Sequence, residues 1–162
     1  MRSSFVLAVA AAAAIVGSSA VADPVSVQFD YTTEEEIRFQ FADKSGHFIL
    51  AVRREGTAEG SGVFAGAAVT DLGWHDVNPP VSGAPQGYLQ LTAQNGDTAV
   101  LRWTVTATFV KGAEGKPAFF NQGIWELVRG TGQFADKRGV GSIILKPAEK
   151  KVILEGEVGD KV

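Results

Sequence analysis

The sequence predicts an all-β protein that folds as a single closed antiparallel β-barrel of about eight strands, with a β-sandwich as the alternative. Apolar and polar residues alternate with a period of two in successive segments, as expected for strands that bury one face. Turn residues separate these segments at the spacing of hairpins. The 162-residue chain also has 19 glycines, which favours the barrel because strands bend sharply at glycine where a barrel curves.

The first 22 residues are expected to be a signal peptide, so that residues 23–162 form the barrel domain. Arg2 supplies a positive start, residues 5–16 are an unbroken apolar run, and Ala20 and Ala22 are the small residues that a signal peptidase reads. The run is shorter than the roughly 20 apolar residues that span a bilayer. The mature chain is therefore predicted to be exported, periplasmic or extracellular, with no membrane attachment after cleavage.

The first half of the mature chain is expected to hold four strands. A first strand is expected at residues 25–31. The alternating residues 36–41 follow, and residues 47–54 continue across a Lys-Ser-Gly turn. Residues 63–75 read as a longer strand whose internal glycines indicate bends or bulges.

The clearest hairpin joins residues 88–93 to residues 97–110. The second segment alternates apolar residues with Thr and Arg almost without exception, which a helix would not do. Asn95-Gly96 lies between the two segments and predicts a tight type I′ turn. Three further strands complete the set, at residues 124–129, 140–145 and 152–158.

Composition excludes several kinds of partner and chemistry. A net charge of −3 argues against nucleic acid, which normally requires a basic patch. The absence of Cys excludes disulfides, thiolate metal ligands and cysteine nucleophiles. Two isolated histidines do not make a zinc site, which needs three or four ligands at suitable spacing. We therefore expect no metal.

Residues 125–141 carry a resemblance to a known family. They read Trp-Glu-Leu-Val-Arg-Gly-Thr-Gly-Gln-Phe-Ala-Asp-Lys-Arg-Gly-Val-Gly, a strand that enters a Gly-Thr-Gly turn before Arg-Gly opens the next strand. This is similar to the turn shared by plant dirigent proteins and bacterial members of the allene oxide cyclase-like barrel group. Gly130 and Gly132 would permit a tight turn with positive φ, Phe134 would plug the barrel end, and Gly139 and Gly141 would let the last strands curl.

The resemblance implies an eight-stranded barrel, often a homotrimer, whose partly apolar lumen holds a small hydrophobic molecule. Dirigent proteins steer the radical coupling of phenols, and allene oxide cyclases close an epoxide-derived ring, in both cases without a cofactor. Arg138 matches the arginine of the family's turn. The candidate polar groups of such an activity are Arg138, Asp136 and the segment around His75.

His75 has two interpretations. A carboxylate near a histidine can orient its ring for acid–base chemistry, and on a strand Asp71 and His75 share one face. The alternative is a surface histidine at the end of a strand. His47 opens its own strand, and a structural role is expected for it.

The aromatic residues also have two interpretations. Phe39, Phe41, Trp103 and Trp125 either fill the core or, together with Tyr88, line a lumen that binds a planar apolar ligand. Three functions stay open: a ligand-binding barrel without turnover, a cofactor-free cyclase, isomerase or dirigent-like protein, and a filled structural or oligomerising barrel.

Overall fold

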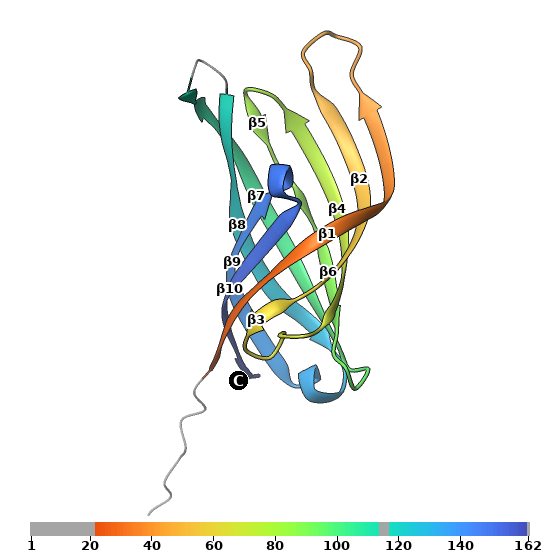
Figure 1. The fold of residues 1–162 in the computed structure, drawn as a ribbon, viewed down its shortest axis with the longest axis vertical. Helices are drawn as coiled ribbons and strands as arrows, with labels where there is room; N and C mark the ends of the chain where they lie inside the picture. The colour runs from red at the N-terminus through yellow and green to blue at the C-terminus, as the bar shows by residue number, and fades with distance from the viewer. Residues whose placement is uncertain (1–21, 114–116, 162) are drawn as a thin grey trace, which may run out of the picture.

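One antiparallel sheet closes on itself in the computed structural model (Figure 1), which describes residues 22–113 and 117–161. The predicted barrel is therefore confirmed. The strands are β1 (Asp23–Gln40), β2 (Phe48–Thr57), β3 (Glu59–Ser61), β4 (Ala68–Asn78), β5 (Ser82–Gly83), β6 (Gln86–Thr92), β7 (Thr98–Lys111), β8 (Pro117–Gly130), β9 (Lys137–Lys146) and β10 (Lys151–Asp160), with short 3₁₀ turns η2 (Gly132–Phe134) and η3 (Pro147–Glu149).

The long strand β1 closes the barrel because its two halves pair with different neighbours. Its first half pairs with β10, from Asp23 opposite Val158 to Asp30 opposite Lys151. Its second half pairs with β2 as far as Gln40. The short strand β3 follows β2 along the first half of β1, and β5 and β6 both lie between β4 and β7. The ten strands of the described chain thus form an eight-stranded barrel wall, because β3 shares a place with β2 and β5 shares a place with β6.

The hairpin between β6 and β7 differs in one detail from its prediction. Thr92 pairs with Thr98, so the connection is longer than a two-residue turn. The Gly96 amide donates to the Ala93 carbonyl, and Gly96 has a φ of 88° whereas Asn95 is not among the residues with positive φ. The turn is therefore of type I followed by a left-handed glycine, which is the usual three-residue form.

The end of the barrel at η2 is packed with aromatic side chains. Phe134 is 2% exposed, and its ring centroid lies 5.9 Å from that of Phe64. Gly130 has a structural role other than the predicted positive φ, because a Cβ there would lie 2.4 Å from the Cβ of Phe134. Gly132 does have a positive φ, of 49°. This end of the lumen is filled.

Glycines in β9 make room for Trp125 in the same part of the core. A Cβ on Gly141 would lie 2.6 Å from the indole nitrogen of Trp125, and one on Gly139 would lie 3.2 Å from the indole ring. Trp125 is fully buried and donates to the Glu155 carbonyl at 3.2 Å. The glycines allow a large side chain to occupy the barrel axis.

The opposite end of the barrel is taller on some sides than on others. The β1–β2 and β7–β8 hairpins rise above the turn η3, which joins β9 to β10 (Figure 1). The pairing of β1 with β10 stops at Asp30. The wall is therefore lower at η3 than elsewhere around this end. Among residues 22–113 and 117–161, no helix is long and apolar enough to cross a membrane.

Candidate functional site

A cavity of about 300 Å³ occupies the end of the barrel opposite η2. This volume is at the lower limit for small-molecule pockets, roughly 300–1,000 Å³. Five strands contribute apolar side chains to its wall, and Pro79, Pro85 and Pro147 also line it. The apolar side chains on these strands are Phe48, Leu50, Val77, Ala107, Phe109, Phe119 and Leu145. The lumen is therefore filled at one end and open at the other.

Buried polar residues lie where the cavity meets the filled core. Arg54, Asp71, His75 and Asn121 are each at most 8% exposed. The alternation of the strands turns all four side chains inward, and Arg54 of β2 lies directly opposite Asp71 of β4. Arg54, His75 and Asn121 line the cavity itself. We call these four residues the polar floor.

Asp71 has two polar contacts inside the barrel. The guanidinium of Arg54 lies 3.5 Å from its Oδ2, and the indole N–H of Trp103 donates to its Oδ1 at 3.2 Å. The Arg54 guanidinium also lies over the Tyr31 ring, with 4.5 Å from Cζ to the ring centroid. This arrangement keeps a cation and a carboxylate together out of water.

Three atoms of the polar floor have unused hydrogen-bonding capacity. Arg54 Nε, His75 Nε2 and Asn121 Oδ1 are buried and find no partner within the part of the chain that the structure describes. Buried polar groups in native proteins are nearly always paired, and each exception needs an explanation. Their common position beside one cavity points to a ligand or ordered water as the missing partner.

Burial shifts the pKa values of two groups in opposite directions. It raises the pKa of Asp71 to about 6, partly offset by the charge of Arg54 and the hydrogen bond from Trp103. It lowers the pKa of His75 to about 4, with a further contribution from the Arg54 charge. At neutral pH the floor therefore holds one cation, one carboxylate and an uncharged imidazole.

The predicted catalytic residues separate into two groups. Asp71 and His75 share the inner face of β4, so the alternative of a surface histidine is wrong for His75, which is 7% exposed. Asp136 and Arg138 are exposed and lie next to η2, at the filled end of the barrel. Arg138 donates to the Val128 carbonyl at 3.3 Å. They cannot act together with His75, because the packed core lies between them.

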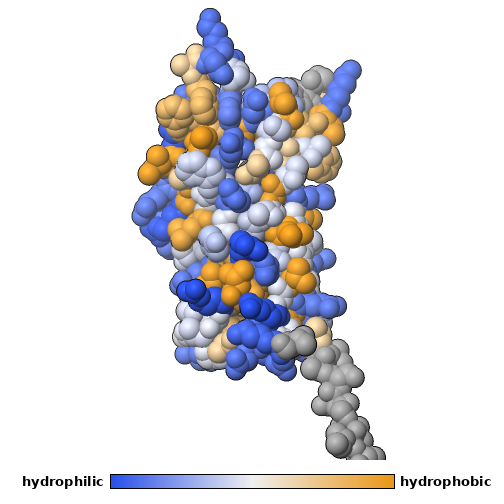
Figure 2. Space-filling model, turned by 180° about the vertical axis from the view of Figure 1, so that it is seen from behind, coloured by the Kyte–Doolittle hydropathy of each residue, from blue (hydrophilic) through white to orange (hydrophobic). Residues whose placement is uncertain are grey.

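The predicted ligand-binding aromatics also need correction. Phe39 and Tyr88 are 59% and 49% exposed on the outer wall, and neither these two residues nor Phe41 lines the cavity. Trp125 lies in the filled core, and Trp103 contacts the polar floor from below. The outer wall carries hydrophobic side chains among hydrophilic ones (Figure 2). Residues 36–40 do belong to a strand with alternating apolar and polar side chains, but the apolar side chains face outward.

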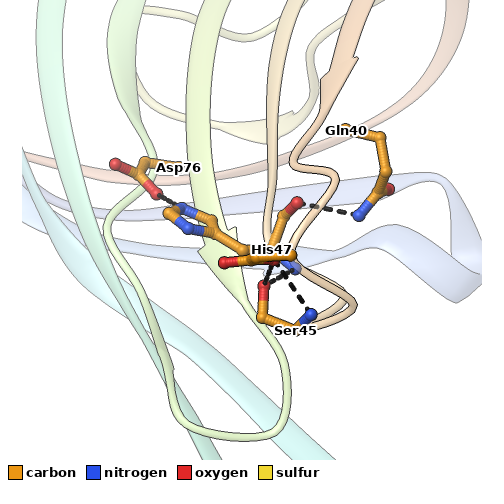
Figure 3. Close-up of polar contacts among 5 residues, drawn as sticks. Gln40, Ser45, His47 and Asp76 are labelled. Atoms are coloured by element: carbon orange, nitrogen blue, oxygen red, sulfur yellow. Dashed lines mark hydrogen bonds and ion pairs between the residues drawn. The ribbon is translucent and has the colours of Figure 1, made fainter.

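His47 anchors the β1–β2 loop to β4 at the rim of the cavity (Figure 3). Its Nε2 lies 2.6 Å from Asp76 Oδ1. Its ring stacks on Phe41 at a centroid distance of 4.3 Å. The His47 amide donates to the Ser45 hydroxyl, and its carbonyl accepts from the Gln40 amide. These contacts support the structural role predicted for His47.

Sequence reasoning missed Arg54, Asn121 and Tyr31. Arg54 could have been found, because it interrupts the inward row of Phe48, Leu50 and Val52 with a charge. Asn121 and Tyr31 gave no comparable indication. Asn121 faces Ala107 and Leu145 across the sheet, and only that long-range register brings it to the cavity.

Fold and cavity define this chain as a small β-barrel with one end filled and the other open. No protein-family model matches the sequence, and no curated protein matches it. Among solved structures, it is similar to the crystal structure of a protein from Acinetobacter baumannii described as β-barrel like. The TM-score is 0.54 and the identity 14%, over 90% of this chain and 99% of that chain. At this identity the likeness bears on the fold alone.

Proposed function

We propose that this barrel binds a small, largely apolar molecule in the cavity at its open end. The observation that carries the proposal is an apolar cavity that ends on buried polar groups with unused hydrogen-bonding capacity. Such sites combine apolar walls with a few polar groups that orient the ligand. The open end argues against a barrel that is filled throughout and only structural.

Export is part of the same proposal and rests on the composition of residues 1–22, most of which lie outside the described residues. The allene oxide cyclase-like or dirigent-like affiliation, and with it the homotrimer, rests on the resemblance of residues 125–141 and stays a prediction.

Native mass spectrometry of the protein purified from its own host tests this function. A co-purifying apolar molecule supports it, and the same spectrum gives the oligomeric state. Leu50→Trp would fill the cavity, whereas Ile49→Trp changes the neighbouring residue on the other face of β2. Loss of the bound molecule in both variants, or in neither, would contradict the assignment of the cavity.

A cofactor-free isomerase or cyclase is the second candidate, because Asp71 has a pKa of about 6 beside an uncharged His75. Groups whose pKa values lie near the working pH are suited to proton transfer. The test is to incubate the protein with epoxide or phenoxy substrates. Three incubations are compared: with the wild-type protein, with Asp71→Asn, and with no protein. If all three give the same product distribution, this candidate is excluded, and the ligand-binding proposal is unaffected.

A further inference from the structure

Arg54 brings more hydrogen-bond donors to the polar floor than its one protein acceptor, Asp71, satisfies. A guanidinium carries five N–H donors. Arg54 directs one nitrogen to Asp71, at the long distance of 3.5 Å, while its Nε is without a partner in the described chain. Arg54 is 8% exposed, so water reaches it poorly. An oxygen that accepts hydrogen bonds is therefore the group that Arg54 lacks, whereas the unpartnered Asn121 Oδ1 would accept a hydrogen bond rather than donate one.

The floor is already balanced in charge. Asp71 faces Arg54 from β2, the Trp103 indole from β7 and the apolar Leu89 from β6, and it shares its own strand with His75. The ring of Tyr31 in β1 packs against the Arg54 guanidinium. One positive and one negative charge are thus present, and His75 adds none at neutral pH.

We propose that the ligand is an uncharged carbonyl compound, such as a flat ketone, whose oxygen accepts a hydrogen bond from Arg54 at the polar floor. The inference rests on the proposed function and adds the chemical class of the ligand. The apolar body of the ketone would lie among the side chains of Phe48, Phe109 and Phe119, which line the cavity above the floor. Aromatic and proline walls suit a flat ring system.

A carboxylate ligand fits the same place poorly. Its charge would lie next to the carboxylate of Asp71, and two carboxylates that share a site cannot both stay ionised without cost. One of them would have to take up a proton. Because burial already raises the pKa of Asp71 to about 6, Asp71 is the group that would be protonated. A carboxylate should therefore bind only below neutral pH.

Three probes with one common ring system test the inference on the mature chain. They are 2-ethylnaphthalene, 2-acetylnaphthalene and 2-naphthoate, and their dissociation constants are measured by calorimetric titration at pH 5.5 and 8. One hydrogen bond to a charged donor corresponds to roughly tenfold or more in affinity. We expect the ketone to bind at least about tenfold more tightly than the hydrocarbon at both pH values. Naphthoate binding should weaken from pH 5.5 to 8.

Two variants separate the roles of the charges. Arg54→Met should remove the advantage of the ketone over the hydrocarbon. Asp71→Asn leaves Arg54 as an unbalanced cation, so the preference should reverse in favour of naphthoate at pH 8. Asp136→Asn makes the same substitution at an exposed site far from the cavity and should leave the preference unchanged. The comparison of the three probes at pH 5.5 and 8 uses only the wild-type protein, so it still tests the inference if a variant fails to fold.

The outcomes distinguish this inference from the proposed function. If none of the three probes binds, the ligand-binding function itself is contradicted. If the hydrocarbon and the ketone bind equally well, the cavity binds ligands but the carbonyl assignment is wrong. Naphthoate that binds more tightly than the ketone to the wild-type protein at pH 8 would also overturn it.

Discussion

Asp71→Asn and His75→Gln should make the stability of the barrel depend on pH in opposite directions. The pKa of Asp71 is raised from 3.8 to about 6, and that of His75 is lowered from 6.5 to about 4. Each shift is about two pH units, and one unit corresponds to about 1.4 kcal/mol. Each residue thus contributes a pH-dependent change of about 3 kcal/mol to the free energy of unfolding.

The signs follow from which state holds the proton. Between pH 4 and 6 the folded protein keeps a proton on Asp71 that the unfolded chain has released, so this contribution falls as the pH rises. Between pH 4 and 6.5 the unfolded chain keeps a proton on His75 that the folded protein has released, so this contribution rises with pH. In the wild-type protein the two contributions nearly cancel over this range.

Guanidinium denaturation at pH 4, 5, 6 and 7, followed by tryptophan fluorescence, measures the effect. Relative to wild type, the free energy of unfolding of Asp71→Asn should increase by about 3 kcal/mol from pH 4 to 6. That of His75→Gln should decrease by a similar amount from pH 4 to 6.5. The control Asp136→Asn, at an exposed carboxylate, should follow wild type. Differences from wild type that stay constant within about 0.5 kcal/mol would refute the reasoning.

Three further predictions concern other parts of the chain. Phe134→Ala should lower the free energy of unfolding by about 3–5 kcal/mol, because it empties the plugged end of the barrel. Phe120→Ala, at a residue that is 55% exposed, should change it by at most about 0.5 kcal/mol; equal losses would contradict the plug. His47→Ala should cost less than about 1 kcal/mol, since its ion pair is partly exposed, and a larger loss would show that the rim supports the whole barrel. The mature protein secreted by its host should begin at Asp23, and an intact mass that includes residues 1–22 would disprove the signal peptide.

The strands were predictable because their information is local. Residues 97–110 alternate with a period of two, and they form β7 (Thr98–Lys111) with the predicted face buried. The same pattern failed to orient residues 36–41. Arg38 pairs with Leu50, which faces the cavity, so the polar row of this segment faces the mouth and the apolar row faces outward. Alternation shows that two faces differ, but only the pairing register decides which face is inside.

The candidate site was predictable in part for the same reason. Asp71 and His75 lie four residues apart on one strand, so their common face follows from strand geometry. The partner of Asp71 does not follow from it, because the register between β2 and β4 places Arg54 opposite Asp71. Arg138 could not be placed in this way. It was chosen because its turn resembles that of a known family, but the fold places it at the filled end of the barrel, away from the cavity.

The position of the polar floor supports the proposed ligand-binding function. An arginine, an aspartate, a histidine and an asparagine inside a barrel cost more than apolar residues of the same size, because each loses its hydration. The chain is able to fill its lumen with apolar side chains, as it does around Trp125 and Phe134. The change from apolar to polar occurs at one level, directly beneath the cavity, where three polar atoms are without a protein partner in the described structure. A purely structural barrel would gain stability by continuing the apolar packing upward. The polar floor therefore supports the proposed ligand-binding function, in which a bound group supplies the missing hydrogen-bond partners.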